Sequence, residues 1–124
     1  MIDLLLGGIF SLMVVALTVF VITSLISASA AGAVNDDARP FVNKAIIGCG
    51  LYAVPLIYVQ IIPIDVVVEA RSLAIGFFFC SLVGLFSAIV ALKLEGMNRK
   101  TLLIHGIGMI VVGFAGVVAT GTPE

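Results

Sequence analysis

Residues 4 to 35 read LLLGGIFSLMVVALTVFVITSLISASAAGAVN, a run without a formal charge. Three further charge-free runs follow, at residues 45 to 64, 72 to 92 and 101 to 123. A membrane-spanning helix needs about 20 apolar residues, because the hydrocarbon core is roughly 30 Å thick and each residue rises about 1.5 Å. All four runs reach that length. The pattern predicts an all-α polytopic membrane protein with four transmembrane helices.

Composition agrees with this interpretation. The 124 residues are 62% hydrophobic and 10% charged, whereas charged residues make up about 25% of soluble domains. We expect a single four-helix transmembrane domain over residues 1–124, with helices at about 4–27, 44–62, 72–92 and 101–120. We expect the first helix to be retained, since the N-terminus carries Asp3 without a basic residue and the apolar run exceeds a signal peptide's roughly 7–15 residues.

The basic residues divide unequally between the connections, which predicts the orientation. The connections between helices one and two and between helices three and four hold five of the six basic residues, namely Arg39, Lys44, Lys93, Arg99 and Lys100. The opposite end has only Arg71, beside Asp65 and Glu69. Short loops rich in Lys and Arg stay in the cytoplasm. We therefore expect two like-oriented hairpins with both termini non-cytoplasmic, in a cytoplasmic or other energy-transducing membrane.

Small residues recur at helical spacing and predict the faces where helices meet. Lipid tails give no hydrophobic drive for association, so close approach of small residues must stabilise helix contacts. The candidate helix-packing residues are Ser24, Ala28 and Gly32 in the first helix, Gly48 and Gly50 in the second, Cys80, Gly84 and Ala88 in the third, and Gly106, Gly113 and Thr120 in the fourth. We expect the Thr120 hydroxyl to bond a carbonyl one turn back.

Few residues within the four runs could do chemistry. No Asp, Glu, Lys or Arg lies inside any run, so the usual intramembrane proton relays and ion sites are absent. His105 is a candidate haem ligand, but one histidine cannot build a bis-imidazole or tetrahedral metal site alone. Pro55 predicts a kink between Leu51 and Pro55. We expect Tyr52 to bond a carbonyl that Pro55 frees.

A 58-residue offset relates the two halves of the chain. Gly48-Cys49-Gly50 matches Gly106-Ile107-Gly108, and Phe20 matches Phe78. A duplicated helical hairpin is one explanation. Because an even-span unit repeats in the same orientation, duplication also agrees with the topology that the basic residues predict.

One stretch resembles a known family. Gly50-Leu51-Tyr52-Ala53-Val54-Pro55-Leu56-Ile57 is similar to the second helix of rotary-ATPase proteolipid (c) subunits, and Ala38-Arg39-Pro40 is similar to their polar loop. The resemblance implies a hairpin that packs into a ring and carries ions. This chain lacks the ion-binding carboxylate, and Tyr52 stands closest to its place. A second likeness, of residues 93 to 100, is to the basic turn of conjugative pilins.

These observations favour a non-catalytic integral membrane subunit that acts through helix packing, in a homo-oligomer or as an accessory subunit of a larger membrane complex. The expected partners are membrane lipids and other transmembrane helices, with no cofactor. The spread of six basic residues over three connections argues against nucleic acid. The alternatives are a small transporter or channel in which Tyr52, Gln60 and His105 line a pathway, a proteolipid-like or pilin-like polymer, and a haem or quinone anchor that uses His105.

Overall fold

The computed structural model describes residues 2–34 and 37–121, and all regular secondary structure in these ranges is helical. The helices are α1 (Ile2–Ala33), α2 (Arg39–Gly50), α3 (Ala53–Ile61), α4 (Val66–Ala91) and α5 (Gly96–Gly121). Four helical segments are long and apolar enough to cross a membrane, because α2 and α3 together form one span, Arg39–Ile61. The prediction of four helical segments long and apolar enough to span a membrane is confirmed.

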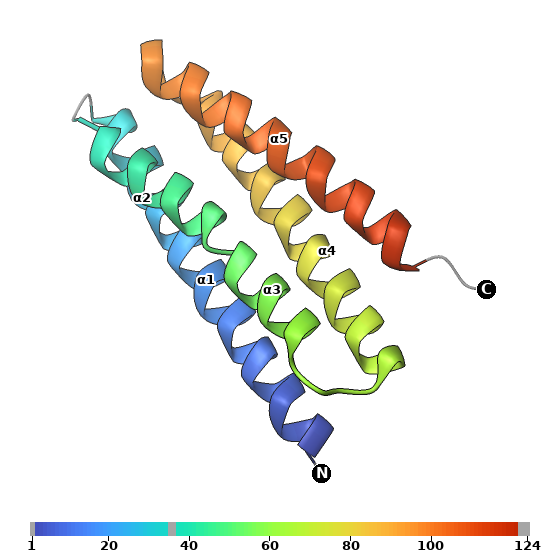
Figure 1. Ribbon diagram of the computed structural model, residues 1–124. Coiled ribbons are helices and arrows are strands. Elements are labelled where there is room, and N and C mark those ends of the chain that lie inside the picture. The colour runs from blue at the N-terminus through green and yellow to red at the C-terminus, as the bar shows by residue number, and fades with distance from the viewer. Residues whose placement is uncertain (1, 35–36, 122–124) are drawn as a thin grey trace.

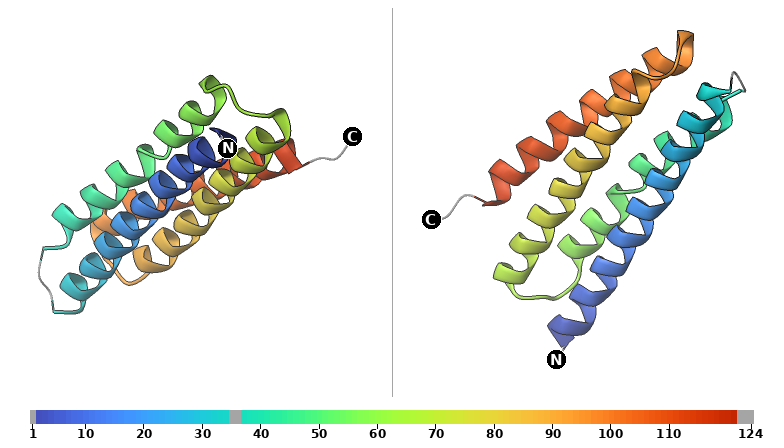
Figure 2. Two further views of the ribbon diagram at one scale, coloured as in Figure 1. Left: turned by 90° about the horizontal axis from the view of Figure 1, so that it is seen from below. Right: turned by 180° about the vertical axis from the view of Figure 1, so that it is seen from behind.

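The helices run up, down, up and down, so the two ends of the molecule differ (Figure 1). The connections before α2 and before α5 lie at one end, while the start of α1, the α3–α4 connection and the end of α5 lie at the other. α4 lies between α5 on one side and α1, α2 and α3 on the other, as the right-hand view in Figure 2 shows. The packed core is formed chiefly where α1, α2, α3 and α4 converge, and α5 packs mainly on α4.

Several helices extend beyond the bounds predicted from the sequence, which were about 4–27 for the first and 44–62 for the second. α1 has 32 residues, about 48 Å at 1.5 Å per residue, and so exceeds the thickness of a hydrocarbon core. α2 begins at Arg39 and not at 44, with a proline in its first turn. Charge-free runs mark what must be inside lipid, whereas a helix continues until its backbone geometry changes.

Local chemistry accounts for the ends of α3 and α4. Ile62 is extended (φ −85°, ψ 154°), as expected for a residue that precedes a proline, here Pro63. The Asp65 carboxylate accepts a hydrogen bond from the Val67 backbone N–H at 3.2 Å and caps α4. The connection therefore covers only residues 62–65.

Candidate functional site

α4 and α5 approach each other closely at Gly84 and Gly106. A methyl group on Gly84 would lie 2.7 Å from the Gly106 carbonyl oxygen, and one on Gly106 would lie 2.8 Å from the Gly84 carbonyl oxygen. Because both neighbours are backbone atoms, neither can move aside without separating the helices. Only glycine at both positions permits this contact.

The same contact continues toward the far end of α5. A methyl group on Gly113 would lie 2.5 Å from the Phe77 carbonyl oxygen, and Gly116 packs directly against the Phe77 ring. The Ser81 hydroxyl donates a hydrogen bond across the interface to the Ile110 carbonyl oxygen at 3.1 Å. The interface thus combines backbone proximity with an interhelical hydrogen bond, the two features that hold helices together in lipid.

α4 presents its small residues to two different neighbours. A methyl group on Gly106 would lie 2.9 Å from the Ala88 backbone nitrogen, so Gly84 and Ala88 both meet α5. Cys80 is buried in the hydrophobic core, to which Cys49 of α2 also belongs. A spacing of four residues drifts about 40° per step at 3.6 residues per turn. Cys80 and Ala88 are therefore turned about 80° apart and do not form a single face.

The small residues of α1 face other parts of the chain. Ala28 is fully buried, and Ser24 is buried with its hydroxyl bonded to the Phe20 carbonyl oxygen at 2.9 Å. A methyl group on Gly32 would lie 2.7 Å from Leu94 Cδ2 in the α4–α5 connection. On α2, a methyl group on Gly48 would lie 2.6 Å from Val21 Cγ2 of α1.

Other glycines lie on outer faces of the molecule. A methyl group on Gly8, Gly50 or Gly108 would meet no atom within 4 Å. Gly50 is therefore not in an intramolecular helix contact, unlike its neighbour Gly48. Near the end of α5, the Thr120 hydroxyl donates a hydrogen bond to the Gly116 carbonyl oxygen at 2.8 Å. This is the bond one turn back that the sequence predicts.

A hydrogen-bonded pair lies at the centre of the span formed by α2 and α3. Tyr52 is only 1% exposed, and its hydroxyl lies 2.5 Å from the Thr18 hydroxyl of α1. Thr18 donates its only hydroxyl proton to the Val14 carbonyl oxygen at 2.8 Å. Tyr52 is therefore the donor to Thr18. The partner is a side chain on α1, and not the carbonyl near Pro55 that the sequence suggested.

The helix is interrupted at Leu51 and Tyr52, within the interval where Pro55 predicts a kink. Pro55 lies in the first turn of α3, where its missing N–H costs little because these groups have no intrahelical acceptor. The Leu51 carbonyl oxygen instead accepts from the Val54 N–H at 3.0 Å. The interruption thus satisfies the backbone while it places Tyr52 against α1.

The other polar side chains named as pathway or ligand candidates lie apart from this pair. Gln60 is exposed, and its amide donates to the Leu56 carbonyl oxygen at 3.0 Å. The Nε2 atom of His105 is buried within the chain and has no hydrogen-bond partner among the described residues. A haem iron could reach Nε2 only after its neighbours moved. Residues 2–34 and 37–121 contain no group of three or more side chains that could hold a metal ion.

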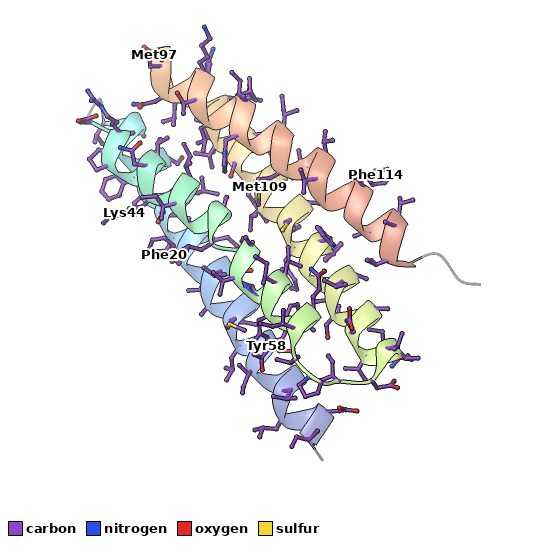
Figure 3. The ribbon with its side chains drawn as sticks, in the orientation of Figure 1. Phe20, Lys44, Tyr58, Met97, Met109 and Phe114 are labelled. Atoms are coloured by element: carbon purple, nitrogen blue, oxygen red, sulfur yellow. The ribbon has the colours of Figure 1, made fainter. Side chains whose placement is uncertain are left out.

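The five basic residues that the sequence assigned to two connections lie at one end of the molecule, opposite Arg71. Only Lys93 is in a connection, since α2 contains Arg39 and Lys44 and α5 contains Arg99 and Lys100. Figure 3 shows Lys44 and Met97 toward that end. One guanidinium nitrogen of Arg99 donates to the Leu92 carbonyl oxygen at 2.8 Å and so caps the end of α4. The Lys44 ammonium lies 5.7 Å from the centre of the Phe41 ring, within the range of a cation–π contact.

Three residues of these contacts were not predicted from the sequence, namely Thr18, Ser81 and Gly116. Thr18 and Ser81 are hydroxyl residues inside charge-free runs, and a hydroxyl in hydrocarbon needs a partner; that requirement was a usable signal. Gly116 falls outside the heptad spacing of Gly106 and Gly113, although it lies one turn from Gly113.

Comparison with known proteins found no match: no family model, no curated protein and no solved structure matches this chain.

Proposed function

We propose that this chain is a non-catalytic integral membrane subunit that works by packing against other transmembrane helices, in a homo-oligomer or a larger membrane complex. The observation that carries the proposal is the environment of Tyr52. A transport pathway through the span would place this hydroxyl in water, yet Tyr52 is 1% exposed and bonded to Thr18. The burial of Tyr52 and its bond to Thr18 therefore support a helix contact without water.

The outer faces supply the surface for such partners. α5 packs mainly on α4, and its outward side chains include Phe114, which is 68% exposed and points away from the other helices (Figure 3). Gly108 lies on this outward side with open space around it. Glycine on an outer face allows the close backbone approach that helix association in lipid uses.

Mild detergent extraction followed by identification of the co-purifying chains tests the proposal. We expect the chain to leave the membrane with other transmembrane chains or with copies of itself. Gly108→Leu should weaken this association, because the larger side chain keeps a partner backbone away, whereas Val111→Leu on the same exposed side should not. A lone monomer with transport activity in liposomes would contradict the proposal.

We further propose the orientation with both termini outside the cytoplasm and the chain as two like-oriented hairpins. Five basic residues at one end of the molecule and one at the other support this assignment under the positive-inside rule. A cytoplasmic membrane or another energy-transducing membrane is the expected location.

A small transporter is the second candidate, favoured by the interruption between α2 and α3. Discontinuous spanning helices commonly form solute and ion sites near the bilayer midplane. This function requires the Tyr52–Thr18 contact to open during the transport cycle. Solute or ion flux into liposomes that contain only this chain, lost in Pro55→Ala, would favour the transporter over the packing subunit.

A further inference from the structure

A cavity of about 460 Å³, lined by polar side chains together with Val42 and Met97, lies between the start of α2 and the start of α5. Small-molecule sites commonly enclose about 300–1,000 Å³, so the cavity is large enough for a compact ligand. The polar side chains that line it are Asp37, Arg39, Asn43, Glu95, Asn98 and Thr101. They come from residues 37–43 and 95–101, two segments that are far apart in the sequence.

The position of the cavity along the bundle points to the membrane interface. Its lining residues lie at 37–43 and 95–101, and the charge-free runs begin at 45 and 101. The lining therefore falls where the chain passes from charged to apolar, which is the level of lipid headgroups. Val42, also in the lining, is buried.

The lining carries charges of both signs. Arg39 offers guanidinium N–H donors, which suit phosphate oxygens. Asp37 and Glu95 offer carboxylate oxygens, which suit an ammonium group. One Asp37 oxygen accepts from the Arg39 backbone N–H at 3.0 Å, which fixes this carboxylate beside the first turn of α2. A purely anionic ligand would meet the two carboxylates, and a simple cation would meet Arg39.

We propose that this cavity binds a phosphoethanolamine group, with its phosphate at Arg39 and its ammonium at Asp37 and Glu95. The group has two possible sources, the headgroup of phosphatidylethanolamine and a soluble phosphoethanolamine ester. Asn43, Asn98 and Thr101 add neutral hydrogen-bonding groups around the two charged ends. Phosphatidylcholine lacks the ammonium N–H donors and so binds more weakly.

Native mass spectrometry of the purified full chain, supplied with equal amounts of competing lipids, tests the proposal. We expect phosphatidylethanolamine to be retained about fivefold more than phosphatidylcholine or phosphatidylglycerol, the factor expected for one interfacial charge contact. Arg39→Gln and Glu95→Gln should each remove this preference. Arg71→Gln, an exposed arginine at the opposite end, should leave it unchanged.

Two further measurements identify the source of the phosphoethanolamine group and detect any folding defect in the variants. Competition by glycerophosphoethanolamine, which has no acyl chains, would assign the site to a soluble ester, whereas its failure to compete would assign it to the lipid. Each variant is compared with the unaltered chain by unfolding without lipid, so that a folding defect is recognised. Equal retention of the three lipids, or a loss in Arg71→Gln as large as in Arg39→Gln, would overturn the proposal.

Discussion

Gly106 of α5 faces the backbone of α4, and this contact leads to a sharp prediction for a single methyl group. Gly106→Ala would place a carbon 2.8 Å from the Gly84 carbonyl oxygen and 2.9 Å from the Ala88 nitrogen. The helices must separate, because backbone atoms cannot rotate away. We expect the free energy of unfolding to fall by about 1–3 kcal/mol, the usual cost of overpacking, as measured by denaturing-detergent titration of the purified chain.

For the monomeric chain in detergent, Gly108→Ala is the matched control, two residues further along the same helix. No atom lies within 4 Å of the added methyl group, and alanine favours helix by up to about 1 kcal/mol over glycine. The stability should stay the same or rise slightly. Equal losses in both variants would show that the effect comes from the helix itself and not from the α4–α5 contact.

A second prediction concerns the hydrogen bond between Tyr52 and Thr18. Tyr52→Phe removes the donor to Thr18, while Thr18 keeps its bond to the Val14 carbonyl oxygen. Interhelical hydrogen bonds in membrane proteins contribute about 0.6 kcal/mol on average and up to about 1.7 kcal/mol. We expect a loss within this range in the same titration. Tyr58→Phe, which removes a longer bond of 3.2 Å to the Leu6 carbonyl oxygen, should cost less.

The sequence shows which residues are small, but it did not predict which neighbour each one meets. Gly84 and Gly106 were named as packing positions and meet each other. Cys80 was grouped with Gly84 by spacing, yet it lies in the core that also contains Cys49 of α2, since a four-residue repeat drifts around a helix. Gly50 lies in open space. The sequence could not indicate this, because the outer face of a membrane helix is as apolar as the inner face.

Among the helices, α2 and α3 show how Pro55 affects the structure of one membrane-spanning segment. Pro55 predicted a kink between Leu51 and Pro55, and in the structure the chain leaves the helix at Leu51 and Tyr52. The sequence could not predict the consequence, since the hydroxyl partner Thr18 is supplied by α1, 34 residues away. Helix ends were less predictable than helix centres, because caps such as Asp65 determine them and hydropathy does not.

If the interruption positions Tyr52, then changing Pro55 and Tyr52 together should give a non-additive effect. Pro55→Ala restores an N–H that can bond the Leu51 carbonyl oxygen, which favours a continuous helix and turns Tyr52 away from Thr18. We expect the two substitutions to show a coupling of at least about 0.5 kcal/mol in a double-mutant cycle. Pro55→Ala with Gly113→Ala, at a distant contact, should be additive. Additivity in both cycles would separate the proline from the tyrosine contact.

For the whole molecule, the number of spans was predictable and their packing was not. A soluble helix reveals its buried face by alternating apolar and polar sides, but here lipid-facing and protein-facing sides are both apolar. The two halves also pack differently. Gly48 meets Phe20 and Val21 of α1, whereas Gly106, its equivalent at an offset of 58, meets Gly84 and not Phe78. A repeat in the sequence therefore does not produce a repeated contact.

The orientation of the whole molecule gives the last prediction. If the positive-inside rule holds, a membrane-impermeant thiol reagent added to intact cells should label Asp3→Cys and should not label Asn43→Cys or Glu95→Cys. The native Cys49 and Cys80 are each 3% exposed and should stay unlabelled, so single substitutions can be compared directly. Permeabilised cells should label all three variants, because each altered position lies at an end of the bundle and outside the charge-free runs. Labelling of Asn43→Cys and Glu95→Cys alone in intact cells would invert the orientation, and with it the membrane leaflet in which the phosphoethanolamine cavity lies.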